Sequence, residues 1–278
     1  MRLLRYGPIG QEKPGLLDDE GGLRDLSAVV GDITPATLAP AQLGHLRGLD
    51  PQSLPKVVGE QRLGAPLTGI GNILGIGLNY ADHARETKGE PPPEPILFFK
   101  HTGSLTGPFD PIPFPPGAER LDWEAELGVV IGAAAHQVSE AEALSHVAGY
   151  MVLHDVSERD YQFKRQGQWG KGKSFPGFCP IGPYLVTADE VPDPQALAIR
   201  LSLNGEAMQN SSTEQMIFPV RFLVSYLSRF LRLLPGDVIA TGTPAGVGLG
   251  RKLFLKPGDV VELSVAGLGT QRQTVTAP

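Results

Sequence analysis

Acidic side chains alternate with apolar ones in the segment Leu121–Leu127, a pattern from which a metal site could be built. Successive side chains of a strand point to opposite faces, so Asp122, Glu124 and Glu126 would share one face, with about 7 Å from each to the next. The following Val129–Ile131 is apolar on both faces, which indicates that the strand enters the interior. Carboxylates that point inward repel one another unless a cation neutralises them. An acidic face in contact with solvent would produce the same alternation, so this alternative stays open.

A third carboxylate for the same cation is Asp155. It follows the apolar run Tyr150–Leu153, and the ends of buried strands commonly present functional groups. The oxygen ligands of Glu124, Glu126 and Asp155 suit Mg²⁺, Mn²⁺ or Ca²⁺ rather than zinc. The sequence therefore predicts a divalent-cation site built from these three residues.

His83 and Glu86 are three residues apart, so they are neighbours if this segment is helical. A carboxylate beside an imidazole fixes its tautomer and raises its basicity, as a general base requires. An ordinary surface histidine near a surface glutamate would have the same spacing. We expect about two helical turns over residues 82–88, ended by Gly89 and the prolines 91–93, within a mobile lid over residues 80–100.

Two glycine-rich segments could contact anions. Residues 167–174 match the phosphate-binding pattern G-x-x-x-x-G-K-S, but that loop needs a buried strand before it and a helix after it. Here residues 157–166 are polar and residues 175–180 cannot begin a helix. Lys173 is instead expected to be a point charge for a carboxylate or an enolate. Residues 241–248 offer backbone amides that could hold an anion, or they form a plain tight turn.

The elements that would position these groups are mostly strands and turns. Glycine and proline number 35 and 26 of the 278 residues, which favours a β-rich α+β fold. Residues 15–26 read as a hairpin, and a capping box at Ser139 opens a helix that reaches about residue 147. One long amphipathic helix is expected over residues 216–233. We expect a small N-terminal domain over residues 1–66 and a catalytic domain over residues 67–278.

Composition excludes several classes of protein. Apolar residues make up 41% of the chain, which rules out a wholly disordered protein, and the net charge of -6 argues against a nucleic-acid partner. No apolar run approaches the roughly 20 residues of a membrane span, so no membrane association is expected. The lone Cys179 cannot form an internal disulfide, which fits a cytoplasmic location.

Taken together, these motifs resemble the fumarylacetoacetate hydrolase family. They lie in the family's order over residues of about 70 to 278, and they are Gly77–His83 with Glu86, Glu124–Gly128, Asp155, Lys173–Phe175, Asn204–Gly205 and Thr241–Gly248. The resemblance implies a mixed β-sandwich roll, a Mg²⁺ or Mn²⁺ ion, and a homodimer or homotetramer.

The resemblance also implies roles for particular residues. Glu124, Glu126 and Asp155 would be the metal ligands, and His83 with Glu86 would activate water. Lys173 would be catalytic, and the substrate would be contacted by Gln162, Thr243, Gly242 and Tyr80. One departure is His101, which follows Lys100 where many family members have proline. The N-terminal stretch of residues 1–18 is similar to a subgroup that acts on 2,4-diketo-3-deoxy sugar acids such as the fuconate and rhamnonate derivatives.

The implied reaction is hydrolysis of the C3–C4 bond of a 2,4-diketo acid, a small 2-oxo acid, to pyruvate and a second acid such as lactate. Decarboxylation of oxaloacetate, or hydration or isomerisation of a 2-oxo-alkenoate, would use the same enolate chemistry and stays open as an alternative. A non-catalytic acidic binding domain would leave the acids dispersed and the His83–Glu86 pair dispensable, and the ordered motifs argue against it.

Overall fold

A nine-stranded mixed sheet carries the residues predicted to bind metal. The computed structural model describes residues 1–86 and 90–278. Within the sheet, β16 and β4 run parallel and the other neighbours run antiparallel. In hydrogen-bonded order the strands are β3 (Leu23–Asp25), β2 (Lys13–Leu17), β1 (Arg2–Tyr6), β13 (Leu185–Thr187), β10 (Val147–His154), β9 (Ala125–Ile131), β16 (Val238–Ala240), β4 (Ile73–Gly77) and β5 (Ile96–Lys100).

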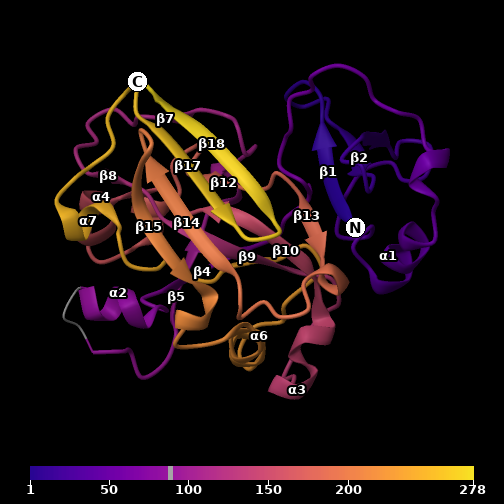
Figure 1. The fold of residues 1–278 in the computed structure, drawn as a ribbon. Helices are drawn as coiled ribbons and strands as arrows, with labels where there is room; N and C mark the ends of the chain where they lie inside the picture. Colours follow the sequence, from indigo (N-terminus) through magenta and orange to yellow (C-terminus); the bar gives the residue numbers. More distant parts are fainter. Residues whose placement is uncertain (87–89) are drawn as a thin grey trace.

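A second sheet of five strands packs against the first, and its strands β14, β15, β17 and β18 lie in front of β9 and β10 in Figure 1. In order these strands are β15 (Glu206–Ser212), β14 (Ala198–Leu203), β17 (Val260–Val265), β18 (Gly269–Thr276) and β7 (Ile112–Pro113). Two small ladders complete the strands, and they pair β8 (Leu121–Asp122) with β11 (Ser157–Glu158) and β6 (Leu105–Thr106) with β12 (Cys179–Pro180).

The large sheet is buried on both faces, which explains its nearly continuous apolar strands. Along β9, Leu127 and Val129 face a core shared with the second sheet and α6, whereas Val130 faces a core shared with the N-terminal segment. Along β10, Tyr150 belongs to the first of these cores and Met151 to the second. The strands alternate faces as the pleat requires, but both faces are apolar.

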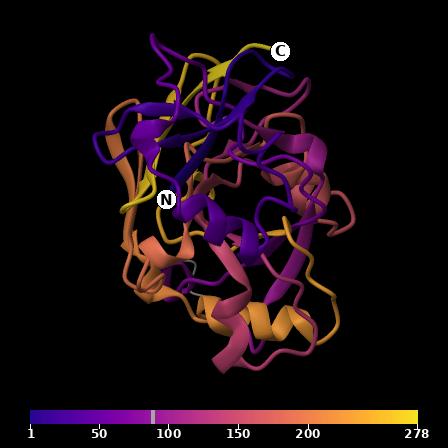
Figure 2. The ribbon, with the colours of Figure 1, turned by 90° about the vertical axis from the view of Figure 1, so that its right-hand side faces the viewer.

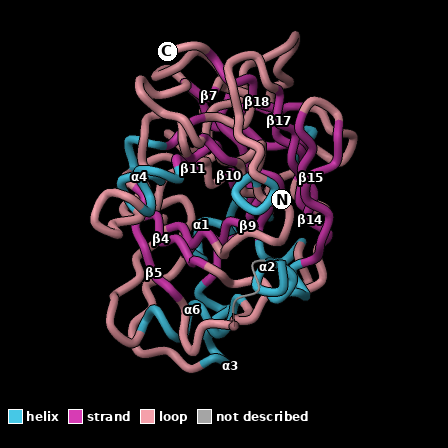
Figure 3. The backbone as a smooth tube through the Cα atoms, turned by 90° about the vertical axis from the view of Figure 1, so that its left-hand side faces the viewer, coloured by secondary structure: helices cyan, strands magenta, loops and turns pink. Residues whose placement is uncertain are grey.

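Helices are short and lie around the sheets. They are α1 (Pro40–Arg47), α2 (Ala81–Glu86), α3 (Glu140–Ala143), α4 (Arg159–Phe163), α5 (Gly170–Lys173), α6 (Val220–Ser228) and α7 (Gly248–Arg251). Figure 2 shows α3 and α6 in contact at one end of the molecule, and Figure 3 places α2 near the same end. No helix in the two described ranges is long and apolar enough to cross a membrane.

The prediction of a helix over residues 216–233 is wrong in length, because α6 spans only Val220–Ser228. α6 begins only after Pro219, which occupies the N-cap in an extended conformation, because proline cannot donate the hydrogen bond that a helix interior requires. The capping box between Ser139 and Glu142 is present, but α3 passes into a 3₁₀ turn at residue 144. The hairpin expected over residues 15–26 forms as β2 and β3.

The N-terminal segment extends the large sheet. β1 pairs with β13, and Leu3 and Leu16 pack in one core with Val130 of β9. In Figure 1 this segment, drawn in indigo, lies beyond β13 at one edge of the large sheet. The strand-rich α+β fold is confirmed, whereas the division into domains at residue 66 stays a prediction.

Candidate metal centre and catalytic site

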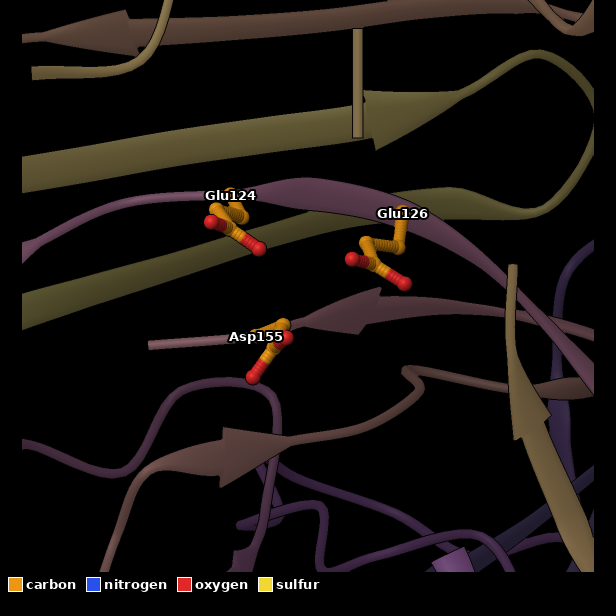
Figure 4. A group of neighbouring side chains, drawn as sticks. All are labelled: Glu124, Glu126 and Asp155. Carbon is orange, nitrogen blue, oxygen red and sulfur yellow. The ribbon is translucent and has the colours of Figure 1, made fainter. Parts of the chain in front are cut away.

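The three carboxylates predicted to bind a cation meet at one point between β9 and β10 (Figure 4). The antiparallel register places Leu153 opposite Glu126, and the Asp155 N–H donates to the Glu124 carbonyl over 2.9 Å. One ligand oxygen from each of Glu124, Glu126 and Asp155 lies within 4.8 Å of the others. All three side chains are buried, so the alternative of an acidic face in contact with solvent is wrong.

Three buried cations bind this cluster. Lys173 Nζ lies 2.7 Å from a Glu124 oxygen and 2.6 Å from an Asp155 oxygen. Lys100 Nζ lies 2.5 Å from the other Asp155 oxygen. Arg159 lies 2.7 Å from both Glu124 and Asp122, so Asp122 belongs to the ion-pair network without joining the three-carboxylate group. Buried ions of this kind are stable only when each has a close partner.

Glu126 is the carboxylate without a cation of its own among the described residues. It accepts a hydrogen bond of 2.9 Å from the Gly242 N–H. Burial, together with the negative charges of Asp155 and Glu124, raises its pKa well above the ordinary value. Burial also acts to raise the pKa of Glu124, but Lys173 and Arg159 outweigh it and lower that pKa to about 2. A cation bound beside Glu126 would offset the repulsion from Asp155 and Glu124.

The donor set fits a divalent cation that prefers oxygen ligands. Three carboxylates from adjacent strand ends suit Mg²⁺ or Mn²⁺, and neither histidine nor thiolate belongs to the group.

Burial alone would lower the pKa of Lys173, but Asp155 and Glu124 raise it above its ordinary value. The lysine thus keeps its proton beside the carboxylates and cannot itself be a metal ligand.

The predicted contact between His83 and Glu86 is present in α2. His83 Nδ1 lies 3.1 Å from a Glu86 oxygen, and the Gly246 N–H donates to both Glu86 oxygens over 3.1 and 3.2 Å. Because a carboxylate only accepts, Nδ1 of the neutral imidazole carries the proton in this contact, and Nε2 is then the ring nitrogen that can accept a proton. The expected continuation of this helix includes Thr87, Lys88 and Gly89, which lie outside the described residues, so the lid stays a prediction.

One cavity of about 350 Å³ joins the two groups. His83, Glu124 and Lys173 all line it, as do the predicted substrate contacts Gln162 and Thr243. A base and the metal cluster therefore face the same space, which is large enough for a small substrate.

Two other predicted substrate contacts lie elsewhere. Tyr80 is fully buried and does not line the cavity, and burial together with Glu126 and Asp82 raises its pKa well above the ordinary value. The N–H of Gly242 is directed at Glu126, with a backbone φ of +96° that favours glycine. Their contact with substrate stays a prediction.

Sequence reasoning missed Lys100 and Arg159 as members of the charge cluster. Lys100 ends the apolar strand β5, and Arg159 begins α4 directly after a buried ladder. A charged residue at the end of a buried element was the sequence feature that could have identified them. The departure at His101 lies outside the cavity lining, since its side chain is exposed and its N–H donates to Ser174 Oγ.

We expect Glu126→Gln to weaken Mn²⁺ binding by at least about 10-fold while the fold persists. The substitution removes a charged ligand at nearly constant volume, and loss of groups that only support ligands already costs about 10- to 100-fold. Isothermal titration calorimetry measures the affinity, with Glu119→Gln on the exposed surface as the matched control. Wild-type affinity in Glu126→Gln would show that Glu126 is not a ligand.

Lys100→Met is expected to lower the free energy of unfolding by about 3–5 kcal/mol in buffer containing EDTA. The change leaves an Asp155 oxygen buried without its cation, and breaking a buried pair has this cost. Lys164→Met, which breaks the exposed pair with Asp160, should cost less than about 1 kcal/mol. Equal urea midpoints for the two variants would contradict a structural role of the buried pair.

The chain is similar to known proteins over most of its length. Residues 72–276 match the family described as fumarylacetoacetate (FAA) hydrolase C-terminal. A protein of Burkholderia lata, named as a hydrolase without a stated substrate, is 55% identical over 276 residues that cover 98% of each chain.

Solved structures of similar fold include both hydrolases and isomerases. The 5-carboxymethyl-2-hydroxymuconate delta-isomerase from Mycobacterium smegmatis is 32% identical with a TM-score of 0.77, over 100% of this chain and 99% of that one. Maleylpyruvate hydrolase from Sphingobium sp. SYK-6, in complex with manganese(II) ion and pyruvate, is 26% identical with a TM-score of 0.82 over the same shares. Because the family match extends over most of the chain and the Burkholderia lata protein is similar over nearly its whole length, the protein belongs to the fumarylacetoacetate hydrolase family.

Proposed function

We propose that the protein is a hydrolase dependent on Mg²⁺ or Mn²⁺ that cleaves the C3–C4 bond of a 2,4-diketo acid. The products are pyruvate and a second carboxylic acid. The observation that carries the proposal is that His83, paired with Glu86, and Glu124 of the carboxylate cluster line one cavity. The manganese and pyruvate bound to the Sphingobium maleylpyruvate hydrolase support the same chemistry for a relative.

Glu124, Glu126 and Asp155 would hold the cation. When bound there, a divalent cation supplies Lewis-acid polarisation of the carboxylate and 2-oxo group of a 2-oxo acid. The protein's own part is to hold the ligands in place and to offset their negative charge. Lys173 and Arg159 do this for Glu124, and Lys100 and Lys173 do it for Asp155.

His83 acts as the general base. Its Nε2 removes a proton from water, the resulting hydroxide bonds to C4, and the C3–C4 bond breaks to leave the second acid and the enolate of pyruvate. His83 releases to solvent the proton that it took from water, and a proton from solvent bonds to C3 and completes pyruvate. Glu86 keeps the imidazole in the required tautomer, and the hydrogen bonds from Gly246 hold Glu86.

Cationic and neutral polar groups stabilise the negative charge that develops on the enolate. Lys173 is fixed in the cavity wall by two carboxylates, so its ammonium offers positive charge to the enolate without moving. The side chains of Gln162 and Thr243 line the same cavity and offer an amide and a hydroxyl.

Isomerisation or decarboxylation of a 2-oxo acid is the second candidate, because the Mycobacterium smegmatis relative is named as an isomerase. These reactions need the enolate but no attacking water. Assembly into a homodimer or homotetramer also remains part of the proposal.

The direct test is incubation of the purified protein with acetylpyruvate and Mg²⁺, followed by NMR. We expect acetate and pyruvate in equal amounts, loss of the reaction with EDTA, and its return with added Mg²⁺. Carbon dioxide from oxaloacetate without acetate from acetylpyruvate would favour the decarboxylase instead.

His83→Ala should separate the two halves of the reaction. Loss of a general base costs about 10²- to 10⁴-fold, so cleavage of acetylpyruvate should fall by that factor. Deuterium exchange into the pyruvate methyl group, followed by NMR with Mg²⁺ present, should fall far less, because enolisation needs no attacking water. His45→Ala, on the exposed face of α1, is the matched control. Equal loss of exchange and cleavage would show that His83 also handles the C3 proton, and the water-activating role would then have to be shared or reassigned.

A further inference from the structure

The cavity has a polar end that is continuous with the carboxylate cluster. Lys173 and Arg159 each bind Glu124, and Arg159 also donates to the Gln162 side chain over 2.9 Å. Thr243 Oγ donates to the carbonyl of Ala125, the residue next to Glu124. Apart from His83 in α2, each polar side chain of the lining therefore contacts Glu124, Arg159 or the backbone next to Glu124.

The rest of the lining that the structure describes is apolar, and we call it the apolar wall. Its aromatic members are Phe98, Phe163 and Trp169, and its aliphatic members are Ile76, Leu78, Val247 and Leu249. The Trp169 ring lies 5.6 Å from the Phe98 ring and 5.8 Å from the Phe163 ring. Lys173 Nζ lies 5.1 Å from the Phe98 ring centroid, so the apolar wall begins directly beside the polar end.

The backbone of β4 is shaped to hold this wall. A Cβ atom on Gly75 would meet the Phe98 ring at 2.3 Å, and one on Gly77 would meet the Trp169 ring at 2.4 Å. Both aromatic rings therefore occupy the space that a side chain at Gly75 or Gly77 would need. Leu78 continues this strand with a φ of +53°, which is unusual for leucine, and its side chain is 37% exposed. An exposed leucine in such a conformation is not explained by core packing.

We propose that the apolar wall selects a 2,4-diketo acid whose acyl group is apolar, either alkyl or aryl. This inference rests on the proposed function, since the polar end would hold the 2-oxo acid part. Among the described residues of the wall, no side chain carries a charge or a hydrogen-bonding group apart from the Trp169 indole. A second carboxylate, or the hydroxyl groups of a sugar acid, would be desolvated there with few partners, which costs binding free energy.

Binding of uncleavable 2-oxo acids tests the wall without relying on catalysis. In buffer with Mg²⁺, calorimetry compares 2-oxohexanoate with 2-oxoadipate, which have six carbons each and differ in a terminal methyl against a terminal carboxylate. We expect 2-oxohexanoate to bind at least about 10-fold more tightly than 2-oxoadipate, and also more tightly than pyruvate, because a methylene in an apolar pocket is worth about 10-fold or more. Equal or tighter binding of 2-oxoadipate in the unmodified protein would overturn the proposal.

Trp169→Ala should reduce the affinity for 2-oxohexanoate by about 10-fold and leave the affinity for pyruvate unchanged, since pyruvate fills only the polar end. The matched control is Phe99→Ala, because Phe99 is 48% exposed, neighbours Phe98 on β5 and does not line the cavity. Equal weakening of both ligands in Trp169→Ala would show that Trp169 supports the whole site and does not select the acyl group.

Failure of the inference and failure of the proposed function give different results. If acetylpyruvate is not cleaved but 2-oxohexanoate still binds more tightly than 2-oxoadipate, the reaction is wrong and the selectivity of the wall stands. If acetylpyruvate is cleaved and 2-oxoadipate binds more tightly, the reaction stands and the apolar acyl group is wrong.

Discussion

Charge balance inside one buried cluster is the constraint on which the rest of the site depends. Four carboxylates, those of Asp122, Glu124, Glu126 and Asp155, are buried with three cations, those of Lys100, Arg159 and Lys173. Charges taken out of water are tolerated only in close pairs, so the positions of the elements that carry them are tightly linked. The acids come from β8, from β9 and the residue before it, and from the residue that follows β10. The end of β5, the start of α4 and the end of α5 supply the cations.

Among the described residues the cluster has one more acid than base, and Glu126 is the acid without an ion pair. A fully paired network would be only structural. Because Glu126 has an amide hydrogen bond but no ion pair in the described ranges, a divalent cation can bind there without displacing a cation from Glu126. Members of the cluster and of the apolar wall line the same cavity. The charged groups suit the part of a substrate that reacts, and the apolar wall suits the part that distinguishes substrates.

Local periodicity was enough to predict several parts of the site. The period of two in β9 placed Glu124 and Glu126 on one face, and the spacing of three in α2 brought His83 to Glu86. Lys100 could not be assigned in this way, because its partner Asp155 is 55 residues away and the pairing depends on how β5 joins the sheet. The length of α6 was misjudged because an amphipathic pattern continues through Pro219, whereas the backbone cannot. The apolar wall was also missed, since Trp169 reaches β4 only through tertiary packing over Gly77.

The most direct measurement of the central claim is anomalous diffraction from crystals of the protein grown with Mn²⁺. We predict one strong peak between Glu124, Glu126 and Asp155, with an oxygen from each at about 2.1 Å, while Lys173 and Lys100 remain paired with Asp155. A peak only at surface carboxylates, or none at millimolar Mn²⁺ with the three side chains unchanged, would contradict the claim that this buried cluster is a divalent-cation site.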